Sequence, residues 1–155
     1  MKTTPRRFFI LAVFALLCGS SIPAFSQETK WYTDFAKAST QAKAENKTIL
    51  LDFTGSDWCP WCQRMDQETL GTQQFLDYAK DNLEWVMVDF LKRIPQPPDV
   101  IAQNLQMKEK FQVKGFPTFI LINPQGTVLW KQEGYLPGGP DAFIAAIQKA
   151  NTPSQ

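Results

Sequence analysis

Two cysteines three positions apart carry the chemistry that this sequence suggests. Residues 58–62 read Trp-Cys-Pro-Trp-Cys, at the junction between a short apolar run and a segment with helical spacing. At the start of a helix, Cys59 and Cys62 would lie on one face, close enough for a disulfide bond. Cys59 would also meet free backbone N–H groups at the positive end of the helix dipole, which lowers the pKa of a thiol. Because the thiolate is the species that attacks disulfides, we expect Cys59 to be an accessible nucleophile and Cys62 its buried resolving partner.

Other uses of this cysteine pair stay open. An inert structural disulfide has the same spacing, and two thiolates alone could hold copper(I). A zinc site would need two more soft ligands, yet the sequence contains no histidine and only one further cysteine, Cys18. The lack of histidine also excludes Ser-His-Asp and Cys-His catalysis. We therefore expect neither a metal nor a cofactor.

The first 26 residues have the pattern of a secretory signal peptide. Basic residues precede an apolar run at 8–18, and small residues at positions 24 and 26 predict cleavage before Gln27. The run would extend about 16 Å as a helix, whereas a bilayer core is about 30 Å thick, which makes a retained anchor the less favoured alternative. We expect residues 1–26 to be removed during export to the periplasm, leaving one domain at 27–155.

Composition and charge suit a single globular domain. The chain has 155 residues, of which 44% are apolar and 20% charged. Removal of the three cations in residues 1–26 changes the formal charge from +1 to −2. No basic run exceeds two residues, so nucleic acid is not an expected partner. A monomer is expected.

Helical and strand patterns alternate along the mature chain. Apolar residues recur at three- and four-residue steps in the expected helices, and short runs rich in β-branched and aromatic residues predict strands. We expect helices at 33–47, from 59 onward, and at 72–80, 99–111 and 141–150, with strands at 49–53, 83–90, 118–122 and 127–131. Thr33 and Asp99 are the expected N-caps. The alternation predicts an α/β fold whose helices cover a sheet ending in one antiparallel pair.

Three short motifs together resemble the thioredoxin superfamily. They are Asp-Phe at 52–53, Trp-Cys-Pro-Trp-Cys at 58–62 and Gly-Phe-Pro-Thr at 115–118, and the resemblance covers roughly residues 31–150. The sequence is most similar to exported bacterial thioredoxin-like thiol:disulfide oxidoreductases and to the periplasmic domain of the membrane disulfide-reductase transporter. This resemblance implies a thioredoxin fold, with a central mixed sheet of about four strands flanked by helices and an extra N-terminal helix.

The resemblance also implies roles for three residues outside the cysteine motif. Pro117 would be a cis-proline facing the cysteines, and the backbone of Phe116 would pair with the substrate chain as an added strand. Asp52 would be a buried acid beneath Cys62, with a pKa raised by burial so that it accepts a proton during resolution. The chain has one residue more between this acid and Cys59 than ordinary thioredoxin has. A strand-entry proline and a solvated strand-end aspartate are the simpler alternatives.

Aromatic and charged neighbours of the cysteines have less specific expectations. Trp58 and Trp61 could form an apolar docking surface and shield the disulfide, or could be ordinary surface packing. The negative charge of Asp57 would oppose thiolate formation, and Arg64 on the following turn could offset it.

The direction of the redox reaction is predicted from the residues between the cysteines. An oxidant needs an unusually stabilised thiolate, and the Pro60-Trp61 dipeptide offers no histidine to supply it. We therefore expect a reductase of protein or peptide disulfides that receives electrons from a membrane donor. The alternatives are a disulfide oxidase or isomerase, a copper-binding protein, and a substrate-binding module with incidental thiols.

Overall fold

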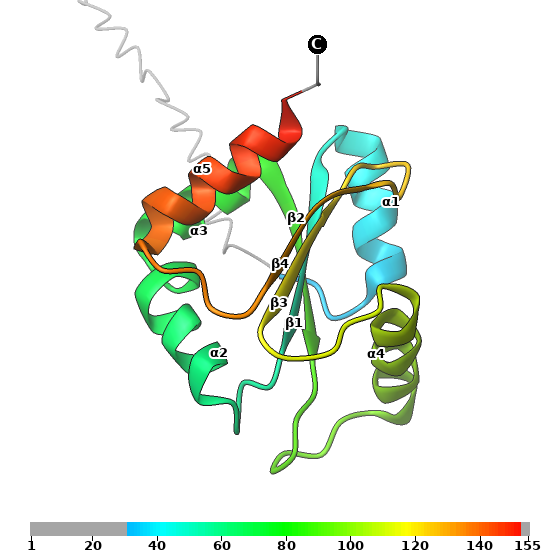
Figure 1. Cartoon of the computed structure of the whole chain (residues 1–155). Helices are drawn as coiled ribbons and strands as arrows, with labels where there is room; N and C mark the ends of the chain where they lie inside the picture. Colours follow the sequence, from blue (N-terminus) through cyan, green and yellow to red (C-terminus); the bar gives the residue numbers. More distant parts are fainter. Residues whose placement is uncertain (1–30, 153–155) are drawn as a thin grey trace, which may run out of the picture.

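A mixed sheet lies between two layers of helices in the computed structural model, which describes residues 31–152 (Figure 1). The predicted signal peptide and Cys18 lie outside this range. None of the helices in the described part of the chain has the length and apolarity needed to cross a membrane. The architecture is the thioredoxin fold with an N-terminal helix, as the sequence motifs imply.

Strand β1 (Thr48–Thr54) lies in the interior of the sheet, between β2 (Leu83–Asp89) and β3 (Thr118–Ile122). It runs parallel to β2 and antiparallel to β3, and β4 (Val128–Glu133) pairs antiparallel with β3 at the edge. Six of the seven residues in β1 are buried, as expected for a strand covered on both faces. The carboxyl ends of the parallel pair β1 and β2 therefore meet at one edge of the sheet, where the cysteine motif follows.

The helices divide between the two faces of the sheet. Helices α1 (Phe35–Glu45) and α4 (Pro98–Lys110) pack on one face. The other face is covered by α2 (Pro60–Met65), α3 (Gln73–Asn82) and α5 (Gly139–Asn151). Side chains alternate across β1, so that each face contributes to its own apolar cluster.

The first helix is capped near Thr33 as predicted, but the predicted cap of the helix at 99–111 is wrong by two residues. The N-cap of α1 is the adjacent Asp34, because the Asp34 carboxylate accepts a hydrogen bond from the Lys37 N–H at 3.1 Å. Helix α4 begins at Pro98 rather than after Asp99, which lies inside its first turn. Proline suits that first position because its missing N–H would have no helical partner there.

Helix α2 does not end in a simple cap but continues as a short π-helical segment, η1 (Asp66–Leu70). The segment closes with a hydrogen bond from the Gly71 N–H to the Asp66 carbonyl at 2.7 Å. A Cβ at position 71 would lie 3.0 Å from that carbonyl oxygen, so glycine allows the close approach.

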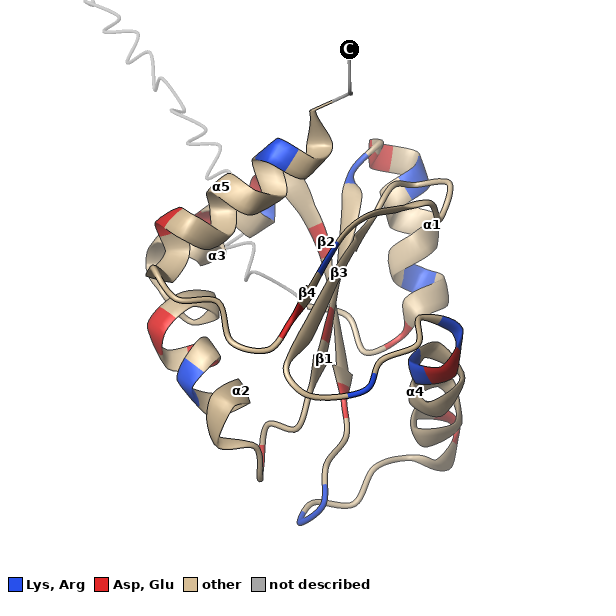
Figure 2. Cartoon of the chain, in the orientation of Figure 1, with Lys and Arg blue, Asp and Glu red and all other residues tan. Residues whose placement is uncertain are grey.

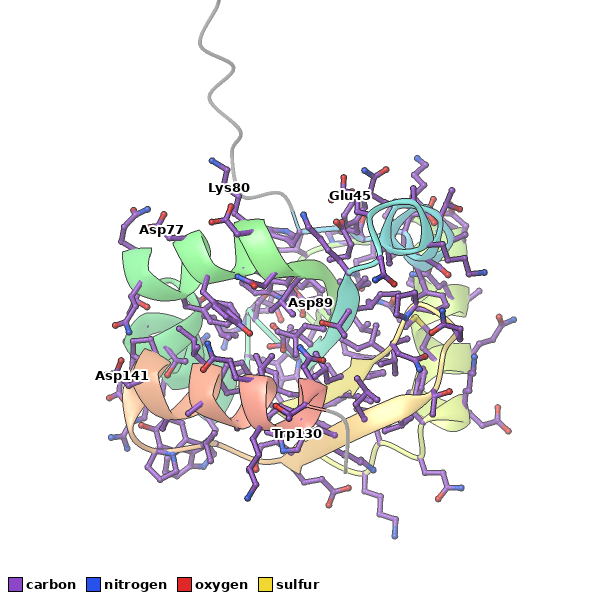
Figure 3. The ribbon with its side chains drawn as sticks, turned by 90° about the horizontal axis from the view of Figure 1, so that it is seen from above. Glu45, Asp77, Lys80, Asp89, Trp130 and Asp141 are labelled. Atoms are coloured by element: carbon purple, nitrogen blue, oxygen red, sulfur yellow. A yellow bond between two sulfur atoms is a disulfide. The ribbon has the colours of Figure 1, made fainter. Side chains whose placement is uncertain are left out.

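Aromatic rings fill the core beneath α5. Phe143 is fully buried, and its ring contacts those of Phe75, Phe119 and Trp130 at centroid distances of 4.9 to 5.7 Å. Figure 3 shows the sheet and helices from above, with Trp130 close to α5. The rings meet at steep angles, the edge-to-face arrangement that aromatic pairs prefer.

We expect Phe143→Ala to lower the free energy of unfolding by about 3–5 kcal/mol, because it removes a ring shared by three aromatic neighbours and leaves a cavity. Urea unfolding followed by circular dichroism measures the change. Leu129→Ala is the control, since this exposed side chain on β4 should alter stability by about 0.5 kcal/mol or less. Equal losses in the two variants would contradict the assignment of Phe143 to the core.

Candidate active site

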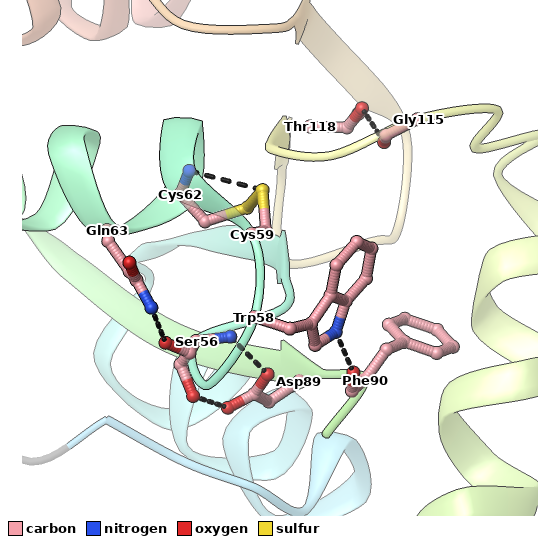
Figure 4. Close-up of a disulfide and its surroundings, with 9 residues drawn as sticks. All are labelled: Ser56, Trp58, Cys59, Cys62, Gln63, Asp89, Phe90, Gly115 and Thr118. Carbon is pink, nitrogen blue, oxygen red and sulfur yellow. Dashed lines mark hydrogen bonds between the residues drawn. A yellow bond between two sulfur atoms is a disulfide. The ribbon is translucent and has the colours of Figure 1, made fainter. Parts of the chain in front are cut away.

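Cys59 and Cys62 form a disulfide where the chain passes from β1 into α2 (Figure 4). Cys59 is the N-cap of the helix, with extended backbone angles, and Pro60 follows in the first turn. Its Sγ accepts a hydrogen bond from the Cys62 backbone N–H at 3.2 Å. The Cα atoms lie 5.3 Å apart, within the usual range for a disulfide. The structure thus joins the two predicted cysteines at a helix N-terminus.

The expected difference in exposure between the two cysteines is wrong for the oxidised protein. Cys59 is 5% exposed and Cys62 is 4% exposed. Cys59 is covered because its sulfur turns back over the end of the helix, toward the N–H group that it caps. The assignment of Cys59 as nucleophile therefore depends on its position at the helix end rather than on a larger exposed area.

Trp58 is held in place on one side of the disulfide. Its indole N–H donates to the Phe90 carbonyl at 2.7 Å, and the Lys92 ammonium lies 3.6 Å from its ring centroid. A Cβ at Gly55 would come within 2.6 Å of the indole, so the ring packs directly over glycine. The rings of Phe90 and Phe116 are 5.0 Å apart, and Phe116 meets Trp58 edge-on at 6.0 Å. We call Trp58, Phe90 and Phe116 the aromatic surface.

Trp61, between the two cysteines in the sequence, is 54% exposed. Its ring is 5.7 Å from that of Tyr135, and the guanidinium of Arg64 lies over both rings. Arg64 also pairs with Glu68 at 3.0 Å, and the Tyr135 hydroxyl donates to the same carboxylate. The positive charge of Arg64 is therefore paired with the Glu68 carboxylate and the two aromatic rings.

The carboxylate of Asp57 has a different partner from the one that the sequence suggested. It accepts hydrogen bonds from the backbone N–H groups of Lys92, Arg93 and Ile94, with the shortest at 2.6 Å. Partial removal from water would raise the pKa of Asp57, but the three N–H groups outweigh it and hold the pKa below its usual value. The loop after β2, not Arg64, thus compensates this negative charge.

A second contact ties the cysteine loop to the end of β2. Asp89 accepts hydrogen bonds from the backbone N–H of Ser56 at 3.0 Å and from its hydroxyl at 2.5 Å. The Gln63 side chain donates to the Ser56 carbonyl at 3.0 Å, which joins α2 to the same turn. Figure 4 shows these bonds together beneath the disulfide. The turn that precedes Cys59 is therefore hydrogen-bonded both to the end of β2 and to α2.

Asp52 lies in β1 on the face covered by α2 and is 3% exposed. Burial raises its pKa to about 8, and the carboxylates of Asp89 and Asp66 add to the shift. Asp52 shares a cavity of about 350 Å³ with Cys62 and Pro117. The additional residue before Cys59 therefore leaves the acid facing the cavity that Cys62 also lines.

The sequence interpretation missed Asp66, which also lines this cavity. Partial burial raises the pKa of its carboxyl. Asp66 follows Cys62 by four positions, a spacing that places two side chains on one helical face, and this was the available signal. The remaining wall combines polar side chains such as Thr54 and Gln67 with apolar ones such as Leu70.

The Phe116–Pro117 peptide bond is cis. The Pro117 carbonyl accepts a hydrogen bond from the Gly134 N–H at 2.8 Å, and the Thr118 hydroxyl donates to the Gly115 carbonyl at 2.8 Å. These bonds fix the backbone on either side of Phe116. Within residues 31–152, the Phe116 backbone itself makes no hydrogen bond, and β3 begins only at Thr118.

The part of the chain that the structure describes contains no group of three or more His, Cys, Asp or Glu side chains placed to hold a metal ion. The arrangement instead combines a disulfide at a helix end, a protonatable acid beside a cavity and a flanking aromatic surface. Such a site can exchange disulfide bonds with another molecule.

Comparison with known proteins agrees with this chemistry. Residues 35–151 match the family described as a thioredoxin-like domain. A disulfide bond reductase, DsbH of Chlamydia pneumoniae, is 34% identical over 83% of this chain and 76% of its own length. The solved structure of a DsbH oxidoreductase superposes with a TM-score of 0.75 and 32% identity, covering 86% of this chain and 91% of the other.

A second group of relatives is larger than this chain. The thiol:disulfide interchange protein DsbD of Pseudoalteromonas atlantica is 30% identical over 60% of this chain, but the match spans only 14% of DsbD. The C-terminal domain of Neisseria meningitidis DsbD shares the fold, with a TM-score of 0.58 and 18% identity over 77% of this chain and 98% of that domain.

We expect Asp52→Asn to stabilise the oxidised protein, with a gain that depends on pH. Well below the ordinary pKa of 3.8 the carboxyl is protonated in both the folded and the unfolded chain. Between that value and about 8, the unfolded chain ionises first, so the acid progressively lowers the free energy of unfolding. The gain should be small near pH 4 and on the order of 4 kcal/mol at pH 7.

Urea unfolding of the oxidised protein at pH 4, 7 and 9 measures this gain. Asp81→Asn is the matched control, since Asp81 is exposed at the end of α3 and should give no comparable gain. A gain from Asp52→Asn that is the same at all three values of pH would show that ionisation of the acid is not its source.

Proposed function

The chain belongs to the thioredoxin-like domain family and is a thiol:disulfide oxidoreductase of the Dsb type, and on that basis we propose that it is a disulfide reductase of exported polypeptides. The observation that carries the proposal is the Cys59–Cys62 disulfide at the N-terminus of α2, with the Cys62 N–H donating to the Cys59 sulfur. In the reduced protein the same N–H and helix end would stabilise a thiolate at Cys59.

The first step forms a mixed disulfide. The Cys59 thiolate attacks one sulfur of the substrate disulfide, and the other substrate sulfur leaves as a thiolate. Trp58, Trp61 and the free backbone of Phe116 surround the place where the substrate must approach. The N–H and C=O groups of Phe116 can pair with an extended substrate chain, and Pro117 holds that backbone beside the disulfide.

The second step releases the product. Asp52, as a carboxylate, takes the proton of the Cys62 thiol through the cavity that both residues line. The Cys62 thiolate then attacks the Cys59 sulfur, which restores the disulfide of the protein and releases the second substrate sulfur. Two electrons have passed to the substrate, and a dithiol donor must return two electrons before the next turnover.

Two observations favour the reductase direction over the oxidase or isomerase alternatives. The relative with 34% identity is named a disulfide bond reductase. The Pro60-Trp61 dipeptide contains no ionisable group, so thiolate stabilisation comes from the helix end rather than from a neighbouring charge. A weakly stabilised thiolate gives a low reduction potential, which is the property of a reductant.

The proposed setting is the periplasm, with a membrane protein as the electron donor. The basic and apolar pattern of residues 1–26 supports export. The match to part of the interchange protein DsbD supports a partner of that kind.

We expect Cys59→Ser to reduce the dithiothreitol-driven reduction of insulin to the uncatalysed rate, because the attacking sulfur is lost. Cys62→Ser should instead accumulate a mixed disulfide with insulin, which a non-reducing gel and mass spectrometry detect. If Cys59→Ser still catalysed insulin reduction, Cys59 would not be the nucleophile.

We expect the Cys59–Cys62 couple to have a reduction potential near −270 mV, the range of thioredoxin. Equilibration with dithiothreitol buffers and thiol alkylation measure it. A potential near −120 mV would assign the protein to the oxidants instead.

A further inference from the structure

A groove lies beside the active site, between the loop that follows β2 and helix α4. The loop spans residues 90–97, and the groove encloses about 350 Å³. Figure 1 shows this loop extending from the sheet at the same end as the turn that precedes α2. We call this feature the loop–helix groove.

Exposed aliphatic side chains concentrate in the loop–helix groove. Ile94, Ile101 and Leu105 line it and are 59%, 44% and 55% exposed. The part of the chain that the structure describes has only seven large apolar side chains with such exposure, and three of them are here. Single exposed apolar residues are common, but a cluster around a depression indicates a surface that another molecule covers.

The groove is continuous with the active site. Phe90 lines its inner end, and the Phe90 carbonyl holds the indole of Trp58, the residue next to Cys59. The Phe90 ring also contacts Phe116, whose backbone is free to pair with a substrate chain. A polypeptide held at Phe116 therefore has an apolar path from the disulfide into the groove.

Hydrogen bonds position both walls of the groove. The Asp57 carboxylate binds three successive N–H groups of the loop, from Lys92 to Ile94. On the opposite side, the Asn104 side chain of α4 donates to the Asp89 carbonyl at 2.8 Å. Because both walls are already positioned, a ligand would bind without the entropic cost of ordering them.

The exposed charges at the tip of the loop are positive. Lys92 and Arg93 are exposed at the loop tip, and in residues 31–152 neither lies within 4.0 Å of a carboxylate oxygen. Figure 2 shows this basic tip below the sheet. The nearby carboxylates of Asp57 and Asp89 accept hydrogen bonds from the protein itself, which leaves Asp99 as the exposed acid at the start of α4.

We propose that the loop–helix groove binds the segment of the substrate polypeptide next to its disulfide, an extended stretch of aliphatic side chains with an acidic residue facing Lys92 and Arg93. This inference rests on the proposed function, since it assigns a substrate preference to the same active site. The aliphatic side chains would cover Ile94, Ile101 and Leu105, and the acidic residue would meet the exposed cations of the loop tip.

The test uses the reduced protein, residues 27–155, and three synthetic peptides. Each peptide carries one cysteine in mixed disulfide with thionitrobenzoate, and its flanking residues on both sides alternate Leu with Glu, Leu with Lys, or Ser with Glu. Attack by Cys59 on the peptide sulfur releases coloured thionitrobenzoate, so absorbance gives the second-order rate constant. The small disulfide 5,5′-dithiobis(2-nitrobenzoate) measures thiol reactivity without a peptide.

Variants separate the groove from the reaction centre. The double variant Ile101→Ser with Leu105→Ser removes the apolar wall, and Arg93→Gln removes one cation of the loop tip while leaving Lys92 on the Trp58 ring. Val128→Ser with Leu129→Ser is the matched control, because these residues are also exposed, 49% and 37%, but lie near the opposite end of β1.

We expect the Leu/Glu peptide to react about tenfold faster than either other peptide, which corresponds to about 1.4 kcal/mol in the free energy of activation. The apolar-wall variant should lose the advantage over the Ser/Glu peptide, and the cation variant should lose most of the advantage over the Leu/Lys peptide. The control should keep both advantages, and the small disulfide should react with all proteins within twofold. Equal rates for the three peptides, or equal losses in groove and control variants, would overturn the proposal. A wild-type protein that reacts with the small disulfide no faster than free cysteine, and fails to reduce insulin, would instead refute the proposed function.

Discussion

The site depends on one interaction, the hydrogen bond from the Cys62 N–H to the sulfur of Cys59 at the start of α2. It makes Cys59 both the reactive atom and the N-cap, so that the fold of the helix and the chemistry of the sulfur are coupled. Strand β1 positions this junction because it is buried on both faces and paired on both edges. Proline in the first turn fits the same junction without losing a helical hydrogen bond.

Asp52, the buried acid beneath the disulfide, lowers the free energy of unfolding at neutral pH. Burial of Asp52 near Asp66 and Asp89 favours its protonated form, and the folded chain is less stable at neutral pH for that reason. The same burial gives the carboxyl a pKa close to that of a thiol, which suits proton exchange with Cys62. Cys62 lines the same cavity as Asp52, which leaves the buried acid a route for that exchange.

The end of β2 connects the reaction centre to the neighbouring surface. Asp89 holds the cysteine loop through Ser56, Phe90 holds Trp58, and the loop beyond them is bound by Asp57. One short stretch of chain therefore supports the disulfide, the aromatic surface and one wall of the loop–helix groove. A change in this loop would affect how the substrate is bound as well as the surroundings of Cys59.

Local patterns in the sequence determined the elements and the cysteine pair. Three-residue spacing at a strand–helix junction indicated the disulfide, and apolar periodicity located the nine predicted helices and strands to within a few residues. Local patterns did not predict the equal burial of the two cysteines, the N–H partners of Asp57 or the contact of Arg64 with Tyr135. Bonds such as Asp57 with Arg93 join residues 36 positions apart, and burial depends on elements from the whole sheet, so only the tertiary structure could decide them.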